Sequence, residues 1–166
     1  MHYGQFNQSI EEGNQAENTF ECSIQKLGFI VEKSSKQQDI YDHIDYYITS
    51  PDGNVLSVDV KARKRSARNS NFTDDIWVEL KNVRGNTGWL YGKQDLIAFD
   101  TSEHFIMVAR ADLSGYIEQV IDFNQPLVNS PRDAFHRLYQ RSGRQDQITI
   151  IKKQELQNLP HTILPY

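Results

Sequence analysis

Two aspartates and one lysine have the types and the spacing of a site that acts on phosphate esters. Asp59-Val60-Lys61 places a carboxylate and an ammonium on one face of a strand, because side chains alternate along β-structure. Asp45 precedes them on another alternating segment. Carboxylate oxygens suit hard cations such as Mg²⁺, and a neighbouring lysine can orient water, help to deprotonate it or stabilise charge on phosphate. These three residues are therefore candidate catalytic residues, with Asp45 and Asp59 as metal ligands.

A β-hairpin over residues 44–62 must bring these side chains together. The run Ser50-Pro51-Asp52-Gly53-Asn54 suits a type I turn that is closed by a left-handed glycine. Such a turn pairs Ser50 with Asn54. Counting back along the two strands from this pair places Asp45 opposite Asp59, with Lys61 one step further on the same face. Opposed like charges destabilise a sheet unless a cation neutralises them. The alternative is a solvent-exposed face on which Lys61 partly neutralises the two acids.

The other elements are predicted from hydrophobic periodicity and capping residues. Residues 1–12 show no sustained period and are expected to be loose, whereas 14–27 form a helix with Asn14 as its N-cap and Gly28 at its end. A polar linker is expected over 34–38. The further predicted elements are strands at 29–33, 76–80, 95–99, 105–109 and 148–151, and a surface helix at 131–142 capped by Ser130. A helix, strands and a later helix predict one α/β domain over 1–166.

The acidic residues and the lysine resemble the signature of a known family. Glu17 in the first predicted helix, Asp45 on a later strand and Asp59-Val60-Lys61 on the following strand look like the PD-(D/E)XK, or restriction-endonuclease-like, nuclease superfamily. The likeness covers roughly residues 13–110, and Ile44 stands where the family name has proline. It implies an αβββαβ core, a mixed β-sheet flanked by helices. It also implies that Asp45 and Asp59 bind Mg²⁺ or Mn²⁺, that Lys61 is catalytic, and that Glu17 assists as a ligand or through water.

The resemblance further implies an endonuclease that hydrolyses DNA phosphodiester bonds. Small members of the family include phage nucleases, junction resolvases, homing endonucleases and restriction enzymes, and many act as homodimers. RNA as substrate stays open, because the phosphate chemistry is shared. A different hypothesis is a catalytically inactive domain that binds nucleic acid or a partner protein. The net charge of −4 motivates this hypothesis, since proteins that coat nucleic acid need a broadly basic surface.

Positive charge is nevertheless concentrated in two places. The first group follows the strand that carries Lys61, and we expect it to contact backbone phosphates. Lys93 and Gln94, which follow Gly92, are further candidates for a polar contact near the phosphate. The cations of this first group are Arg63, Lys64, Arg65 and Arg68. The second group is Arg132, Arg137, Arg141 and Arg144, which could grip a phosphate backbone or form a solvated face.

Composition limits the remaining possibilities. Hydrophobic residues make up 38% of the chain, the mean hydropathy is −0.64, and neither a membrane span nor a secretory signal is visible, so a cytoplasmic protein is expected. The single Cys22 is expected to be a small buried side chain. Trp77 and Trp89 are expected in the core. Glu79 is either an additional metal ligand or a surface charge.

Overall fold

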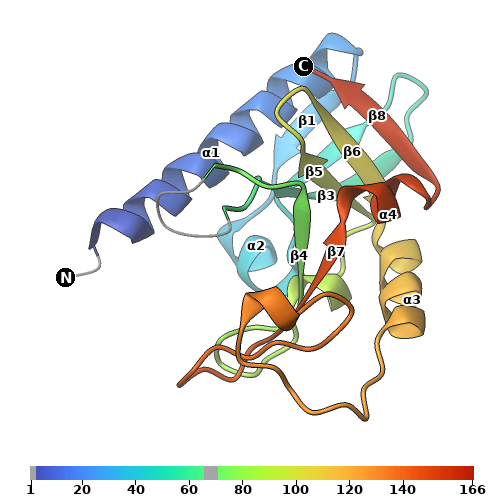
Figure 1. The fold of residues 1–166 in the computed structure, drawn as a ribbon. Coiled ribbons are helices and arrows are strands. Elements are labelled where there is room, and N and C mark those ends of the chain that lie inside the picture. The colour runs from blue at the N-terminus through green and yellow to red at the C-terminus, as the bar shows by residue number, and fades with distance from the viewer. Residues whose placement is uncertain (1–2, 66–70) are drawn as a thin grey trace.

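A mixed six-stranded sheet runs through the computed structural model, which describes residues 3–65 and 71–166 (Figure 1). The elements in chain order are α1 (Tyr3–Lys26), β1 (Ile30–Lys33), α2 (Lys36–Asp42), β2 (Tyr46–Thr49), β3 (Val55–Lys61), β4 (Asp75–Lys81), the 3₁₀ helix η1 (Trp89–Tyr91), β5 (Leu96–Asp100), β6 (His104–Ala109), α3 (Arg110–Val120), the 3₁₀ helix η2 (Pro131–Asp133), β7 (Gln147–Lys152), α4 (Lys153–Gln157) and β8 (His161–Pro165). The predicted α/β class, a mixed sheet flanked by helices, is confirmed.

The large sheet has the strand order β1-β2-β3-β5-β6-β8. β3 and β5 pair in parallel, and the other neighbours pair antiparallel. β4 pairs with β7 in a separate two-stranded sheet, so the predicted strand at 76–80 does not join the signature hairpin (Figure 1). In its described part, the crossover from β3 to β5 contains β4 and η1, where the αβββαβ order has a helix.

The two faces of the large sheet are covered by different helices. On one face, Phe20 of α1 packs with Val58 and Ala98 of the sheet. On the other, Leu113 of α3 packs with Ile97 and other sheet residues, and with β4 and η1. Alternate residues of β3 and β5 therefore point to opposite layers. Among the described residues, none of the helices has the length and apolar character that a membrane crossing requires.

The hairpin of β2 and β3 has the predicted turn and register. Gly53 is left-handed at φ 91°, and the Ser50 N–H donates to the Asn54 carbonyl at 2.9 Å. Tyr46 pairs with Val58, and the register continues regularly to the turn. This register places the residues before Tyr46 beside the end of β3 that carries the signature lysine.

The expectation of a loose end is wrong over residues 3–12, because α1 begins at Tyr3 and Asn14 lies inside the helix; residues 1–2 lie outside the described part of the chain. The buried side chains of Phe20 and Ile24 anchor the later turns, and Glu12 is held by an ion pair with Arg65 at 3.2 Å. Helix formation is cooperative, so an anchored segment extends into neighbouring residues without an apolar stripe. Gly28 ends the helix region with φ 83°, as predicted.

Two further predictions about side chains and linkers differ from the structure. Cys22 is exposed, because it lies on α1 away from the stripe that contacts the sheet. The linker expected over 34–38 instead contains the start of α2. Ser35 and Gln38 form a reciprocal capping box, with the Gln38 N–H donating to the Ser35 hydroxyl at 3.2 Å. This S-x-x-Q pattern is a recognised start of a helix.

The helix predicted at 131–142 is reduced to η2, although Ser130 does cap it as expected. His136 has a left-handed backbone with φ 55°. The backbone N–H groups that a helix would use internally instead bond to β7, as Tyr139 N–H does to the Ile148 carbonyl at 2.7 Å. Pairing with a strand has overridden the local helical pattern. The helices α3 and α4 and the strand β8 were not predicted.

Candidate active site

Asp59 and Lys61 lie on the face of β3 that points away from α1. Val58 and Val60 fill the core below α1, so the alternation of the strand turns the two charged side chains toward the opposite side. Asp59 is 2% exposed. The Lys61 Nζ lies 2.8 Å from Asp59 Oδ1, with 27% of the lysine side chain exposed. The same ammonium lies 5.2 Å from the centre of the Trp89 ring, which is buried as predicted.

Asp45 is the residue just before β2, and its side chain lies near Asp59 and Lys61. Its N–H donates to the Val58 carbonyl at 2.9 Å, although Val58 already pairs with Tyr46, so the ladder is irregular at this step. The prediction that Asp45 pairs directly with Asp59 is therefore wrong, because two residues, Asp45 and Tyr46, stand opposite Val58. The Asp45 carboxylate Oδ2 accepts a hydrogen bond of 2.7 Å from the Val60 N–H. Besides burial, the charge of the Asp45 carboxylate raises the pKa of Asp59, so the two carboxyl groups are neighbours. The structure thus brings together the two aspartates and Lys61.

Burial and the neighbouring charges shift the pKa values of this group. Burial raises the pKa of Asp59, the ammonium of Lys61 opposes this shift, and the carboxylate of Asp45 adds to it. Burial alone lowers the pKa of Lys61, but the adjacent Asp59 raises it above its usual value. Lys61 therefore stays an ammonium at neutral pH. Such a group can donate hydrogen bonds and stabilise negative charge, and it is poorly suited to act as a base.

Gln94 holds Asp59 from the side opposite Lys61. This residue, just before β5, is 2% exposed. Its Nε2 donates to the Trp89 carbonyl at 2.7 Å and to Asp59 Oδ2 at 3.3 Å. A side chain at Gly92 would overlap the Gln94 oxygen, so the glycine makes room for this amide. The sequence signalled only a polar residue after a glycine, and the contact with Asp59 depends on the parallel pairing of β3 and β5.

Glu17 approaches the group from a different side. It lines a depression together with Asp45, Asp39 and Lys33, and its carboxylate lies 3.6 Å from Lys33 Nζ. Burial and the charge of Asp45 raise the pKa of Glu17. Glu17 is therefore a neighbour of Asp45. Asp39 of α2 is an acid at this position that the sequence reasoning missed, because the segment carrying it was expected to lead directly into the hairpin.

A cleft of about 200 Å³ opens at the carboxyl ends of the parallel strands β3 and β5. Lys61 lies on its wall, and Glu79 of β4 faces it from the opposite side. Burial raises the pKa of Glu79, and the charge of Lys61 partly offsets this. Ligands of sheets with parallel strands commonly bind at such a strand end. The signature lysine is thus accessible from a cleft, whereas Asp59 lies behind it.

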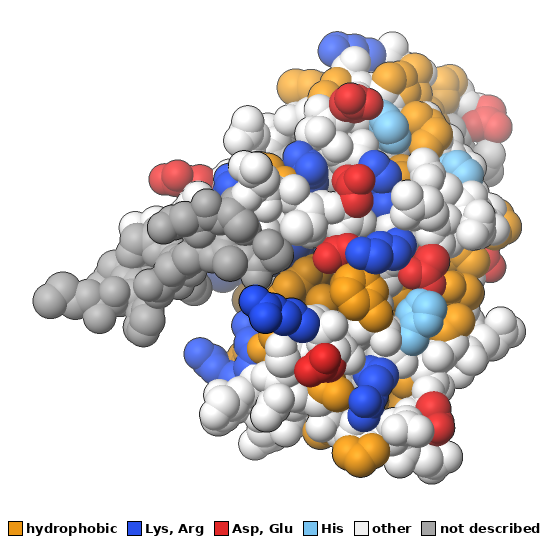
Figure 2. Space-filling view, viewed as in Figure 1, with side chains coloured by type: hydrophobic (Ala, Val, Ile, Leu, Met, Phe, Trp, Pro, Cys, Tyr) orange, Lys and Arg blue, Asp and Glu red, His pale blue; other side chains and the backbone are white. Residues whose placement is uncertain are grey.

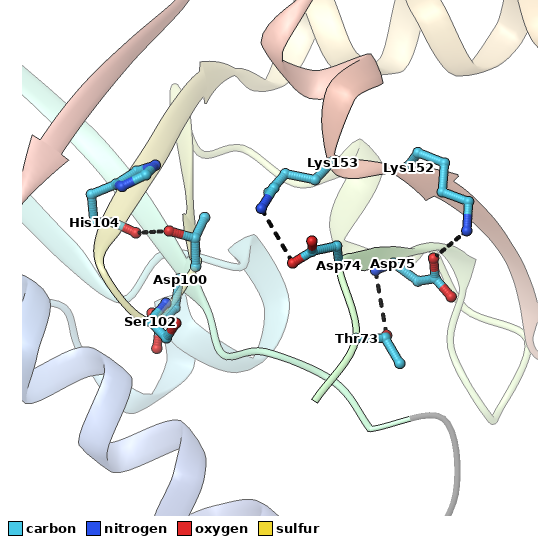
Figure 3. A network of polar contacts seen from close by, with 9 residues as sticks. Thr73, Asp74, Asp75, Asp100, Ser102, His104, Lys152 and Lys153 are labelled. Atoms are coloured by element: carbon cyan, nitrogen blue, oxygen red, sulfur yellow. Dashed lines mark hydrogen bonds and ion pairs between the residues drawn. The ribbon is translucent and has the colours of Figure 1, made fainter. Parts of the chain in front are cut away.

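Ion pairs fasten the outer wall of this cleft, as Figure 3 shows. Lys153 of α4 points toward Asp74 at 3.2 Å, and Lys152 of β7 points toward Asp75 at 2.8 Å. The Asp75 N–H donates to the Thr73 hydroxyl at 3.3 Å. These contacts tie the start of β4 to the end of β7, so the cleft has a braced wall opposite β3.

The cations predicted to bind phosphates are placed differently from one another. Arg63 and Lys64 line the cleft. Arg65 is paired with Glu12 of α1 and packs on the Phe72 ring. Lys93 is 76% exposed in its side chain and bonds to Asp42 at 2.9 Å, and Arg68 lies outside the described residues. The lining of the cleft contains as many acidic as basic residues, and basic and acidic side chains are likewise mixed on the face seen in Figure 2.

The donor set fits a cation that keeps much of its water. Within 3–65 and 71–166, no three or more His, Cys, Asp or Glu side chains form a group that could hold a metal ion together. Mg²⁺ commonly binds through one or two carboxylates, and water and substrate phosphate complete its shell. Asp45 and Asp59 provide two carboxylates. Comparisons with models of protein families, with curated proteins and with solved structures found no match to this chain.

Proposed function

We propose that this chain is a divalent-metal-dependent endonuclease of the PD-(D/E)XK type that hydrolyses DNA phosphodiester bonds. The observation that carries the proposal is the grouping of Asp45, Asp59 and Lys61 at the end of β3. Two carboxylates lie together, and an ammonium is paired with one of them at 2.8 Å beside a cleft. Perturbed acids next to a fixed cation in a cleft are typical of catalytic sites.

Each residue has a separate task in this proposal. Asp45 and Asp59 hold the Mg²⁺ or Mn²⁺ ion, and Glu17 assists from the Asp45 side. When bound, the ion supplies Lewis-acid activation of the phosphate and of an attacking water. Lys61 stays protonated and stabilises the negative charge that develops on the phosphate oxygens. Gln94 fixes the direction of the Asp59 carboxylate, as partners of metal ligands commonly do.

Two cations at the cleft can contact a polyanionic substrate. Arg63 and Lys64 line it beside Lys61, although the lining also holds as many acids as cations, and contacts of this kind position a phosphate backbone without reading its sequence. The mixed charge of the face in Figure 2 agrees with a local contact rather than with broad coating of nucleic acid.

The direct test is cleavage of supercoiled plasmid and of branched DNA with Mg²⁺ and with EDTA. Asp59→Ala should abolish cutting and Lys61→Ala should slow it about 100-fold or more, whereas Glu103→Ala, a change at an exposed acid between β5 and β6, should cut as the parent does. Cutting in EDTA, or cutting by the Asp59 and Lys61 variants at the rate of the parent, would contradict the proposal. The same assay with labelled RNA decides whether DNA is the preferred substrate.

A second candidate is a domain of this fold that binds nucleic acid or a partner without cutting it. The observation in its favour is that Asp59 is 2% exposed and already paired with Lys61, which competes with a metal ion for the carboxylate. DNA binding by the parent, unaffected by metal and never followed by cleavage, would favour this candidate.

A further inference from the structure

A second groove adjoins the cleft at Lys61, beside the β4–β7 sheet. We name it the Arg141 groove; it has a volume of about 200 Å³. Its lining is Lys64, Arg65, Trp77, Glu79, Trp89, Arg141 and Ile148. Four of these, Lys64, Trp77, Glu79 and Trp89, also line the cleft at Lys61. The groove therefore adjoins the cleft, and these four side chains lie at the boundary that the two share.

Arg141 is held in a defined position by a buried carboxylate. Asp146 is fully buried, and it accepts hydrogen bonds from both the Arg141 N–H, at 3.1 Å, and the Arg141 Nε. Asp146 thereby fixes the base of the guanidinium, while 44% of the arginine side chain remains exposed. A guanidinium presents several N–H donors in a planar fork, so engagement of Nε leaves donors for another anion.

The backbone around Arg141 is also fixed. The Arg144 N–H donates to the Arg141 carbonyl at 3.1 Å, and Gly143 takes the left-handed conformation that this turn requires, with φ 71°. Tyr139 and Ile148 exchange backbone hydrogen bonds of 2.7 and 3.0 Å at the base of the turn. A preorganised cation loses little conformational entropy when it binds an anion.

Two side chains of the groove can donate to an anionic group. Arg65 is paired with Glu12 and Arg141 with Asp146, so Lys64 faces the groove as a cation opposed by Glu79, and Arg141 contributes the guanidinium N–H donors that Asp146 does not engage. Glu79 lies near both Lys61 and Arg141, whose charges each lower its pKa against the effect of burial. The two cationic positions are thus separate, with Lys61 in the cleft and Arg141 in the adjoining groove.

We propose that Arg141, oriented by Asp146, binds a backbone phosphate of DNA that flanks the phosphate to be cut. This inference rests on the proposed function, because it takes the polymer at Lys61 to be DNA. It assigns a role to Arg141 alone among the four arginines of the second basic group. The contact positions the strand and does not read its sequence.

The test is DNA binding in EDTA, with fluorescence anisotropy of a labelled duplex measured at several salt concentrations. The variant is Arg141→Ala combined with Asp146→Asn, because the second change avoids a buried unpaired carboxylate and keeps an acceptor for the backbone N–H. Binding should weaken about tenfold, as for loss of one charge-assisted hydrogen bond. The slope of log K against log salt should fall by about one, as for loss of one phosphate contact.

Arg144→Ala is the matched control, because Arg144 is an exposed arginine in the same turn. It should bind with the affinity and salt slope of the parent. Asp146→Asn alone should give an intermediate affinity, since the charge of Arg141 remains but its anchor is weakened. Thermal unfolding identifies any variant that fails to fold.

The proposal is overturned if the folded double variant binds DNA with the affinity and salt slope of the Arg144 control. Arg141 and Asp146 would then only close the turn. Failure of the proposed function looks different, because the parent would bind DNA without cutting it when Mg²⁺ is added. The comparison of Arg141 with Arg144 decides the phosphate contact in either case.

Discussion

The Lys61 ammonium lies 2.8 Å from the Asp59 carboxylate, and both project from one face of β3. Asp59 is buried, so its charged form is disfavoured even with this partner, and its pKa is raised. A strand that carried an apolar residue at position 59 would avoid this cost. The placement therefore favours a site that is kept for its chemistry, and it makes the pH dependence of stability informative.

Asp59→Asn should stabilise the metal-free protein at pH 8 and abolish cleavage. The folded pKa of Asp59 lies above its unfolded value of about 3.9, so its stabilising contribution is complete below that value and is lost as the pH rises through the folded pKa. The asparagine variant avoids this loss. We expect a gain of about 1 kcal/mol or more at pH 8, or roughly 2–4 °C in Tm for a chain of this size, shrinking toward zero near pH 4.

Thermal unfolding of the parent and the variant from pH 4 to pH 9 measures this difference. Glu103→Gln, a change at an exposed acid, serves as the control and should show no such trend. An Asp59→Asn protein that is less stable than the parent at pH 8 would mean that the ion pair with Lys61 outweighs the cost of burial.

Lys61→Ala should lower kcat about 100-fold or more, the usual cost of removing a group that stabilises developing charge. Lys61→Arg should restore only part of the rate, because a planar guanidinium does not reproduce a compact ammonium beside Asp59 and the Trp89 ring. Single-turnover cleavage of a labelled duplex measures both. Lys93→Ala, at an exposed lysine paired with Asp42, is the control and should retain kcat. Equal rates for the alanine, arginine and parent proteins would remove Lys61 from the chemistry.

Gln94→Met should raise the Mg²⁺ concentration needed for half-maximal cleavage by about 10-fold. The substitution keeps the shape of the side chain but removes the Nε2 group that donates to Asp59 at 3.3 Å, and partners of metal ligands typically contribute this much to affinity. Metal titrations at saturating DNA measure the shift. If the variant only unfolds at lower temperature and its metal requirement is unchanged, Gln94 supports the fold through Trp89 and does not position Asp59.

The hairpin was predictable in detail because its information is local. The turn around Gly53 sets the register from Tyr46 to Thr49, as counting residues predicts. The same counting does not describe Asp45, whose N–H bonds to the Val58 carbonyl, so its position near Asp59 involves an irregular step that the pattern did not predict. The helix from Ser35 was readable by the same kind of local pattern, although it was interpreted as a linker. The N-terminal extent of α1 could not be predicted in this way, because its first turns have no apolar stripe. They extend a helix whose later turns are the part that packs on the sheet.

The rest of the site depends on contacts between distant segments. Gln94 reaches Asp59 only because β3 and β5 pair in parallel, which no local pattern specifies. The segment 131–142 has a helical pattern, but its backbone groups bond to β7, and the energy of that pairing exceeds a weak local preference. The position of Arg141 beside the cleft at Lys61 also depends on contacts between distant segments. Sequence reasoning found this arginine and assigned it to a helix that does not form.

Glu17→Gln and Glu79→Gln should affect different steps of the reaction. Glu17 lies beside Asp45 in a depression, so its loss should raise the Mg²⁺ requirement about 10-fold with little change in DNA affinity. Glu79 faces Lys61 across the cleft that takes the substrate, and its removal deletes a negative charge there. The Glu79 variant should therefore bind DNA more tightly and keep the metal requirement of the parent. Metal titration and anisotropy in EDTA, applied to both variants, separate the two roles, and the reverse pattern would make Glu79 the acid that completes the metal site.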